Sequence, residues 1–342
     1  MDTLVSFSEA IDSAKETGEP LSILLGNGFS IAYDADSFSY KKLLEKAEFD
    51  GAKKDELFEA LGTEDFERAI DSLRRAASLA DMYGSSHADL ARRMRQDADA
   101  VKNGLSSVLA QIHPNSSSAI SDDEVRCAGR FLANFDNIFT LNYDLLLYWV
   151  LLKNRDFGIL LAAGYDGFGK PTSGVDTLVW KGERQYLHYL HGALHLFLEE
   201  GPDQLTGLEK LTRKYGRLMD QIQNKIAADR YPHVVTEGSM REKMDKISQS
   251  PYLKFCMEAL LKVRGSLFMY GVGLNENDTH IRAAIALSRV SRLFVSIRSD
   301  SSSAALKARV GDIVDRRSGK GGEAIEVVYY DAATADAWRV PT

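Results

Sequence analysis

The stretch Leu21-Ser22-Ile23-Leu24-Leu25-Gly26-Asn27-Gly28-Phe29-Ser30 decides the fold of this chain. A short apolar run that ends at a glycine is typical of a buried strand. The two glycines allow a sharp turn and a close approach of the backbone to a ligand, and the first amides of a following helix can face a phosphate. The stretch therefore predicts a strand, a turn and a helix that hold a nucleotide pyrophosphate, with a plain strand-to-helix turn as the alternative.

Five later segments have the same character as this first strand. They cover about residues 135–141, 187–190, 266–270, 293–297 and 324–330, and the first three end in polar or glycine-rich residues. A repeated order of strand, turn and helix predicts an α/β fold with a Rossmann-like parallel sheet and helices on both faces. Ligands bind such sheets beyond the carboxyl ends of the strands, which is where these clusters fall.

Two long segments interrupt this pattern. Residues of about 40–110 and 203–262 are charged and have helical periodicity, so we expect large helical insertions within a single domain that spans residues 1–342. Residues 164–175 are rich in glycine and predict a loop. A helix over about 121–133 is expected to begin with a capping box, formed by a serine and by a glutamate three residues later.

The cluster Thr140-Leu141-Asn142-Tyr143-Asp144 places an amide and a carboxylate inside an apolar stretch. An unpaired buried polar group costs on the order of a few kcal/mol, so Asn142 and Asp144 need internal partners or a ligand. Either residue could also cap the helix that is expected to begin near Leu145. A helix cap would account for the position of one of these two polar side chains, but less easily for the positions of both.

A third cluster, His191-Gly192, follows the predicted strand at 187–190. An imidazole with a pKa near 6.5 can accept or donate a proton at neutral pH, and His191 lies where ligands bind. His188, His191 and His195 could together suggest a metal site. No carboxylate or thiolate stands at a supporting spacing, so we expect no metal, and His195 is expected to pack or cap in the next segment.

The fourth cluster, Gly271-Val272-Gly273-Leu274, again permits a close approach of the backbone to a ribose or a phosphate. Taken alone, it would indicate only a loop. Its value lies in its position, because it follows the predicted strand at 266–270 and thus joins the other clusters at the same edge of the sheet.

Composition and charge argue against several classes of function. The chain has 342 residues and a formal net charge of −7, which argues against binding nucleic acid by itself. Its two cysteines, Cys127 and Cys256, cannot form a four-thiolate zinc site and do not indicate a disulfide framework. The longest apolar run, residues 145–152, is too short to span a bilayer, and the first residues do not resemble a signal peptide. We therefore expect a cytoplasmic protein without membrane contact.

The motifs Gly26-Asn27-Gly28-Phe29-Ser30, Thr140-Leu141-Asn142-Tyr143-Asp144, Leu190-His191-Gly192 and Gly271-Val272-Gly273-Leu274 together resemble those of the sirtuin-like superfamily. That pattern consists of a G-A-G-x-S turn, a T-x-N-x-D strand end, a catalytic H-G and a G-x-S loop. Within that superfamily, the motifs resemble those of the bacterial sirtuin-like NAD-hydrolase domains of anti-phage defence systems and of an uncharacterised bacterial family close to them. Those domains also carry helical insertions, and Asp65-Phe66-Glu67 is expected to lie in a comparable helix.

Three departures from the family pattern refine what the resemblance implies. Asn27 stands where alanine is usual, and Gly273 stands where a serine usually contacts a ribose. The chain also lacks the cysteines of a zinc ribbon, which true sirtuin deacylases use beside the acyl-lysine groove. This absence favours hydrolysis of the dinucleotide over protein deacylation.

The resemblance implies that the chain is an NAD glycohydrolase, which cleaves NAD to nicotinamide and ADP-ribose and takes NAD as its substrate without a metal. Asn142 would orient the nicotinamide ribose or the attacking water, Asp144 would lie near the nicotinamide end, and His191 would act as general base. The implied cofactor-binding residues are Gly26, Asn27, Gly28, Phe29, Ser30, Thr140, Gly192, Gly271, Gly273 and Leu274. Of these, Gly26, Gly28 and Ser30 would hold the pyrophosphate, while Gly271 and Gly273 would line the adenosine side.

The resemblance further suggests an effector of anti-phage defence that forms a homo-oligomer or works with a partner ATPase or a phage-sensing protein. The alternative from another class is a sensor or scaffold that binds NAD or ADP-ribose without turnover. A protein deacylase or an ADP-ribosyltransferase is a further alternative. Release of nicotinamide distinguishes the first two functions, and a mass shift on an acylated peptide or on a partner protein would reveal the others.

Overall fold

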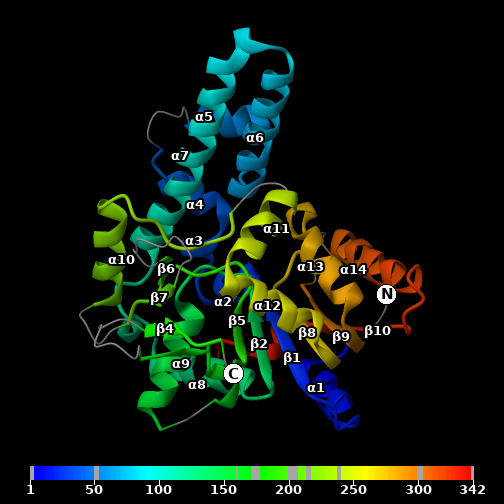
Figure 1. The fold of residues 1–342 in the computed structure, drawn as a ribbon. Helices are drawn as coiled ribbons and strands as arrows, with labels where there is room; N and C mark the ends of the chain where they lie inside the picture. The colour runs from blue at the N-terminus through cyan, green and yellow to red at the C-terminus, as the bar shows by residue number, and fades with distance from the viewer. Residues whose placement is uncertain are drawn as a thin grey trace.

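A computed structural model describes residues 4–49, 54–158, 161–170, 178–182, 184–198, 207–212, 217–236, 240–298 and 303–339. A sheet of six parallel strands lies at the centre of the molecule (Figure 1). The strands are β1 (Leu21–Leu25), β2 (Asn137–Thr140), β5 (Leu187–Tyr189), β8 (Arg264–Tyr270), β9 (Arg289–Ile297) and β10 (Glu326–Asp331). The six predicted strands and the Rossmann-like α/β fold are therefore confirmed.

The order of these strands across the sheet is β10-β9-β8-β1-β2-β5. In chain order this is 6-5-4-1-2-3, the order of a doubly wound Rossmann sheet. The chain moves outward from β1 through β2 to β5 and then returns to the other side of β1 as β8. The strand order thus reverses between β1 and β8, and ligands of such sheets bind at the carboxyl ends of the strands at this reversal. Because Leu25 pairs with Tyr270, both strands end at the same level.

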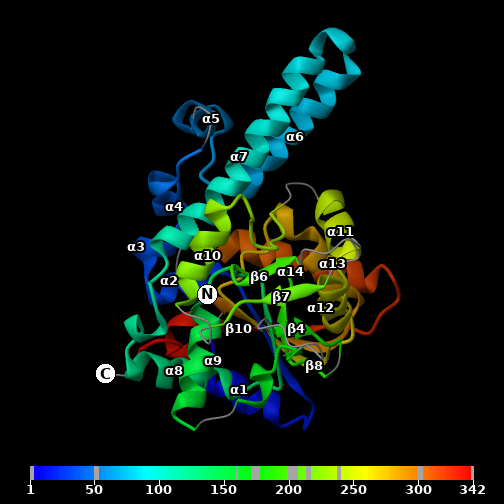
Figure 2. The same cartoon turned by 60° about the vertical axis from the view of Figure 1, so that its left-hand side comes forward.

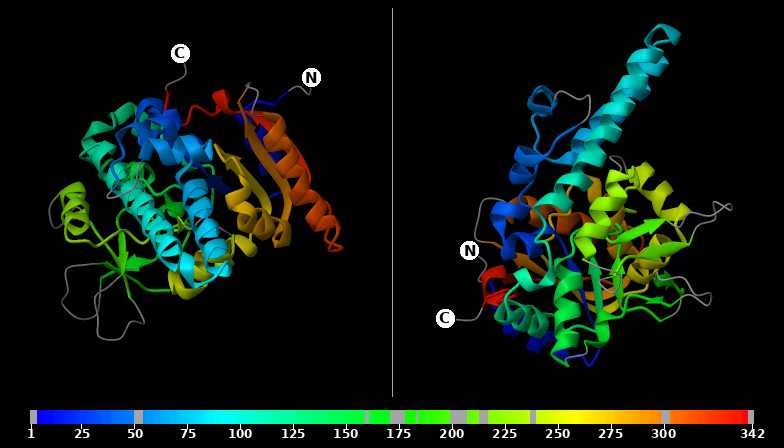
Figure 3. Two further views of the ribbon diagram at one scale, coloured as in Figure 1. Left: turned by 90° about the horizontal axis from the view of Figure 1, so that it is seen from above. Right: turned by 90° about the vertical axis from the view of Figure 1, so that its left-hand side faces the viewer.

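Helices cover both faces of the sheet (Figure 3). The helices next to the sheet are α1 (Phe7–Lys15), α2 (Asn27–Tyr33), α8 (Asp122–Leu132), α9 (Leu146–Asp156), α12 (Pro251–Leu261), α13 (Thr279–Leu287) and α14 (Ser303–Ser318). The predicted capping box of α8, between Ser121 and Glu124, is present. Within the described ranges, no helix combines the length and apolar character that crossing a membrane requires.

Aromatic packing holds α1 and α8 against the sheet. The ring of Phe7 on α1 lies 5.2 Å from that of Phe131 on α8 and 6.1 Å from that of Phe268 on β8, measured between centroids. Phe268 also stacks on Phe294 of the neighbouring strand at 4.4 Å. Burying each such side chain contributes about 1.5–3 kcal/mol, so this layer anchors the strands whose ends carry the predicted site.

The first insertion is helical, as predicted. It contains α4 (Tyr40–Lys46), α5 (Lys54–Leu61), α6 (Phe66–Met82) and α7 (Ala88–Ile112), and the short helix α3 (Ala35–Phe38) precedes it. Helices α6 and α7 pack on each other and project from the body as a hairpin (Figures 1 and 2). The carboxylate of Asp65 caps α6, which places Glu67 in its first turn.

A second, antiparallel sheet was not expected from the sequence. Its strands, in spatial order, are β3 (Phe168–Gly169), β4 (Leu178–Trp180), β7 (Leu208–Lys210) and β6 (Leu196–Leu198). The predicted loop is therefore wrong at β3, and the predicted second helical insertion is wrong at β7. Strands of two or three residues are too short to have a readable periodicity, and their pairing joins distant segments. Residues 171–175 of that loop and 203–206 of that insertion lie outside the described residues.

The rest of the second insertion is largely helical where it is described. It contains α10 (Leu218–Ala227) and α11 (Met240–Gln249), which precede α12. Helix α11 contacts α12 and α13, so this insertion reaches the helix layer beside β8. The second insertion therefore comes close to the carboxyl edge of the sheet.

Candidate functional site

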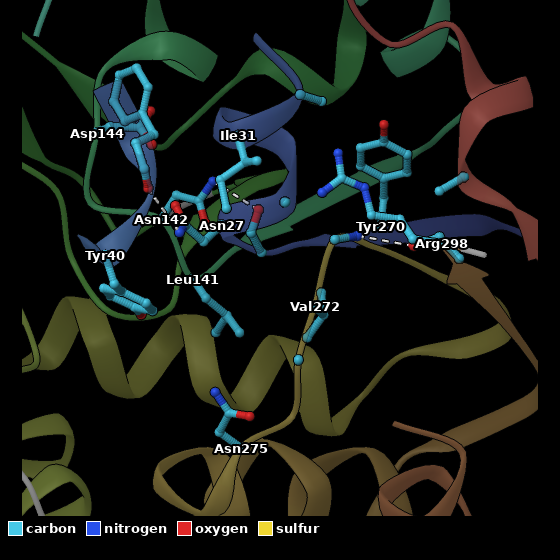
Figure 4. A pocket seen from close by; sticks show the side chains of 18 of the residues that line it. Asn27, Ile31, Tyr40, Leu141, Asn142, Asp144, Tyr270, Val272, Asn275 and Arg298 are labelled. Atoms are coloured by element: carbon cyan, nitrogen blue, oxygen red, sulfur yellow. Dashed lines mark hydrogen bonds between the residues drawn. The ribbon is translucent and has the colours of Figure 1, made fainter. Parts of the chain in front are cut away.

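A cavity of about 850 Å³ lies beyond the carboxyl ends of β1, β2 and β8 (Figure 4). Its volume falls within the range of about 300–1,000 Å³ that small-molecule sites occupy. The predicted site residues that line it are Gly26, Asn27, Gly28, Asn142, Asp144, His191, Gly271 and Gly273. Clusters that follow four different strands therefore meet at one cavity, where the strand order reverses.

The turns after β1 and β8 pack directly against each other. A Cβ atom on Gly28 would lie 2.4 Å from Cα of Gly271, and one on Gly26 would lie 2.5 Å from the carbonyl oxygen of Gly271. Gly271 has a φ of 64°, in the left-handed region that favours glycine. These clashes are with backbone, so glycine is required at all three positions, which we name the glycine corner.

The backbone amides of the glycine corner are largely used inside the protein. Gly26 donates to the carbonyl of Tyr270 at 3.0 Å, Gly28 donates to Gly271 at 2.9 Å, and Phe29 donates to Gly26 at 2.9 Å. We expected the first amides of this helix to face a pyrophosphate, and the geometry differs from that expectation. The glycines allow two turns to pack closely, and these three amides already have acceptors.

A chain of hydrogen bonds fixes Asn142 beside the glycine corner. Its Nδ2 donates to the carbonyl of Gly26 at 3.0 Å and to Oγ of Ser30 at 2.9 Å. The hydroxyl of Ser30 donates to the carboxylate of Asp144, whose other oxygen accepts from the amide of Leu146 at 2.9 Å. Burial raises the pKa of the Asp144 carboxyl. Asn142 and Asp144 thus have internal partners, and Asp144 supports Asn142 through Ser30.

The same bonds determine which atom Asn142 offers to a ligand. The carbonyl of Gly26 can only accept, so the atom that faces it is Nδ2, and both of its hydrogens are used. Oδ1 forms no hydrogen bond with a described residue and is not sealed from solvent. Asn142 therefore presents a hydrogen-bond acceptor, which suits a hydroxyl, a water or a carboxamide N–H.

The remaining predicted site residues lie behind the cavity wall. Phe29 is buried in the aromatic core, and Oγ1 of Thr140 accepts from the amide of Asn142 at 3.1 Å. Gly192 has a φ of 75°, and a Cβ there would lie 1.9 Å from a backbone carbonyl oxygen. Leu274 is fully buried. Of these residues, Thr140 directly contacts a residue that lines the cavity, Asn142.

His191 is buried and pairs with a second histidine, His280, at the start of α13. Their Nε2 atoms are 2.9 Å apart, and their ring centroids are 5.1 Å apart. Burial, with the positive charge of Lys243, lowers the pKa of His191 well below its ordinary value and that of His280 to about 3. Both imidazoles are therefore neutral at pH 7, and one proton lies between the two Nε2 atoms.

The sequence analysis missed a buried ionic cluster beside this pair. The carboxylate of Glu67 accepts hydrogen bonds from the hydroxyl of Tyr143 and, at 2.6 Å, from Nζ of Lys243. Nζ of Lys243 also lies 4.0 Å from the carboxylate of Asp278, and its side chain is completely buried. We name Glu67, Tyr143, Lys243 and Asp278 the Glu67–Lys243 cluster.

Burial and opposing charges set the protonation of this cluster. Burial lowers the pKa of Lys243, but the charges of Glu67 and Asp278 outweigh it, and the net shift is upward. Burial raises the pKa of Asp278 to about 7, against the attraction of Lys243. The sequence signal was weak, because Lys243 stands 176 residues from Glu67 in the other insertion.

The charged side chains of the cavity lie in two groups. Asp65, Glu67 and Asp278 line the cavity, and their carboxylates all act on Tyr40, which lines it as well.

Arg298 and Arg339 act instead on Tyr270, on the other side of the cavity (Figure 4). Asp336 adds a carboxylate beside Tyr270, whereas Arg309 donates to the carbonyl of Gly273 at 2.8 Å and borders a second pocket together with Asp65. The cavity therefore has one acidic end and one end where two arginines lie near Tyr270.

The three histidines considered as metal ligands do not gather. His188 stacks on Phe139 with 4.6 Å between ring centroids, and His195 stacks on Tyr148 at 4.6 Å. Across the described part of the chain, no group of three or more histidine, cysteine, aspartate or glutamate side chains could hold a metal ion.

Comparisons with known proteins place the chain in a family but give no activity. No curated protein matches it. A family profile described as "Domain of unknown function (DUF4917)" matches residues 23–338. This range contains five of the six parallel strands of the central sheet completely, and most of the sixth, β1. Since this match covers far more than half of the sequence, the chain belongs to the DUF4917 family.

Proposed function

We propose that this protein binds NAD in the cavity at the strand reversal and hydrolyses its bond between nicotinamide and ribose. One observation carries the proposal: Asn142, His191 and the glycine corner, which are far apart in the sequence, line one cavity of about 850 Å³. The cavity lies where doubly wound sheets bind nucleotides. The motifs that resemble the sirtuin-like superfamily are the ones that converge there.

The charges of the cavity fit the charges of the substrate. The pyrophosphate of NAD is anionic, and Arg298 and Arg339 supply positive charge near Tyr270. The oxidised nicotinamide ring is cationic, and Glu67 and Asp278 supply carboxylates at the other end. Opposite charges attract, so this arrangement favours one orientation of the dinucleotide.

In the proposed reaction, the bond from C1′ of the ribose to the nicotinamide nitrogen breaks, and its electron pair stays on nicotinamide. The oxygen of a water molecule bonds to C1′, and that water loses a proton. Oδ1 of Asn142 accepts a hydrogen bond from the water or the ribose, and neutral His191 accepts the proton. Asp278 lines the cavity, and its carboxylate form, which a pKa of about 7 keeps available at neutral pH, stabilises the positive charge that develops on the ribose.

The test is release of nicotinamide from NAD by the purified protein, followed by chromatography. His191→Ala should lower the rate by about 10²–10⁴-fold, the usual contribution of a general base, and Asn142→Ala should also lower it. His87→Ala and Asn224→Ala serve as matched controls because both residues are exposed. Full NAD cleavage by either cavity variant would exclude the assigned roles.

Other outcomes of this assay point to other functions. Binding of NAD or ADP-ribose by calorimetry without nicotinamide release would indicate a sensor or scaffold. A mass shift on an acylated peptide or on a second protein would indicate a deacylase or an ADP-ribosyltransferase. The resemblance to sirtuin-like domains of anti-phage systems further suggests that the protein is an effector in anti-phage defence. A loss of cellular NAD during phage infection would support this role.

A further inference from the structure

His280 is a buried residue that reaches the cavity only through another side chain. It is the second residue of α13, and only 4% of its surface is exposed. It is not among the residues that line the cavity, whereas its partner His191 is. Any effect of His280 on a ligand must therefore pass through the bond of 2.9 Å between the two Nε2 atoms.

The cavity can reach only one nitrogen of His191. Nε2 is occupied by His280. Nδ1 has no hydrogen-bond partner among the described residues, and it remains accessible to solvent. Because His191 lines the cavity, Nδ1 is the nitrogen that a ligand can approach.

The position of the shared proton decides whether Nδ1 can act as a base. A neutral imidazole carries one N–H, so a proton on Nε2 leaves a lone pair on Nδ1, and a proton on Nδ1 removes it. Burial and the charge of Lys243 lower the pKa of His280, and the backbone of Asn277 opposes this shift, although Nδ1 of His280 has no partner at hydrogen-bond distance among the described residues. Because the Asn277 backbone attracts a proton to this ring, we place the N–H of His280 on Nδ1. His280 then has a bare Nε2 that accepts from His191.

We propose that His280 is a positioning residue that accepts a hydrogen bond from Nε2 of His191 and leaves Nδ1 of His191 free to accept a proton from the ligand. This inference rests on the proposed function for the identity of the ligand. The arrangement follows the general logic of a base whose far nitrogen is held by a third group. Burial, with the positive charge of Lys243, keeps both rings neutral before the reaction, so the lone pair on Nδ1 of His191 is available.

Two substitutions at His280 separate positioning from packing. His280→Gln keeps an oxygen that can accept from Nε2 of His191, and His280→Phe keeps the ring volume without an acceptor. We expect His280→Phe to lower kcat for NAD cleavage by about 10–100-fold, as is typical when the partner that orients a functional histidine is lost, with KM changed little. His280→Gln should restore most of that loss. The pH profile of kcat should shift in His280→Phe and remain in place in His280→Gln.

Nuclear magnetic resonance of protein with ¹⁵N-labelled histidine tests the same inference without turnover. His191 should carry its proton on Nε2 in the wild type and in His280→Gln, and should lose this preference in His280→Phe. Wild-type kcat in a folded His280→Phe variant, or a proton on Nδ1 of His191 in the wild type, would overturn the inference. If the wild-type protein cleaves no NAD, the proposed reaction is excluded. The tautomer of His191 in the resonance experiment then still shows whether His280 positions His191.

Discussion

The two sides of the cavity are built in different ways. The glycine corner consists of backbone, where Gly28 and Gly271 pack so closely that a single Cβ would clash at 2.4 Å. The Glu67–Lys243 cluster consists of side chains from two insertions and two strand-end turns, held by hydrogen bonds and by the attraction of buried charges. Steric fit between backbones therefore determines the structure of one side of the cavity, and electrostatic attraction between side chains determines the structure of the other.

This difference has a consequence for how each side tolerates change. A steric contact between backbones cannot relax by moving a side chain, so the corner accepts glycine alone. A buried charge depends instead on its partners, because removing one partner leaves the other uncompensated. The following predictions test the two sides against each other, from the largest expected effect to the smallest.

The largest effect is expected from Lys243→Met in the cluster. Glu67 would lose its cation while still facing Asp278, and breaking a buried pair in this way costs about 3–5 kcal/mol. Chemical denaturation at pH 7 measures the free energy of unfolding. Lys262→Met is the control, because Lys262 is 77% exposed, and its pair with Glu258 should contribute about 0–1 kcal/mol. Equal losses for the two variants would contradict the view that electrostatics holds this side.

A loss of about 1–3 kcal/mol or more is expected from Gly28→Ala in the corner, because the added methyl overlaps with the backbone of Gly271. Nicotinamide release should fall with it, since the turn would have to shift. Gly311→Ala on α14 is the matched control, because no atom lies within 4 Å of its added Cβ. An alanine there should stabilise the helix by about 0.5–1 kcal/mol. Unchanged stability of Gly28→Ala would show that the two turns are not packed as described.

The cluster should also make stability depend on pH, which the corner cannot do. The folded-state pKa of Asp278 is about 7 and its ordinary value is 3.8, so the folded state holds this proton more tightly. The resulting stability is present below about pH 4 and is lost as the pH rises to 7.

Asp278→Asn should therefore gain stability relative to the wild type as the pH rises from about 4 to about 7, with a slope of at most about 1.4 kcal/mol per pH unit. Denaturation at several pH values measures this slope, with exposed Asp123→Asn as the reference for the general pH dependence. A difference that stays constant with pH would exclude Asp278 as the titrating group.

The smallest effect is expected from Ser30→Ala, which lies between the two sides. It removes the hydroxyl that links Asn142 to Asp144 and should cost about 1 kcal/mol of stability. Its effect on nicotinamide release should be larger than its effect on stability, because Asn142 loses one of the two bonds that fix its amide. Ser72→Ala on α6 is the control, since the hydroxyl of Ser72 bonds only within its own exposed helix. A Ser30→Ala variant with wild-type kinetics would remove Ser30 from the support of Asn142.

Local sequence patterns were sufficient for the central fold. Each parallel strand is a short apolar run that ends at a glycine or polar cluster, and those signals lie within a few residues of one another. The capping box of Ser121 and Glu124 is equally local and was predicted from its spacing. The small antiparallel sheet was missed because strands such as Phe168–Gly169 are too short to have a period.

By itself, the sequence determined the parallel sheet, the glycine-rich turns and the candidate roles of Asn142 and His191, because strand and turn signals are local. Only the tertiary structure decided that Gly26 and Gly28 pack on Gly271, that His280 holds Nε2 of His191, and that Lys243 joins Glu67. These contacts join segments far apart in the chain. Their energies depend on burial and on the distance between groups, and neither quantity exists until the chain has folded.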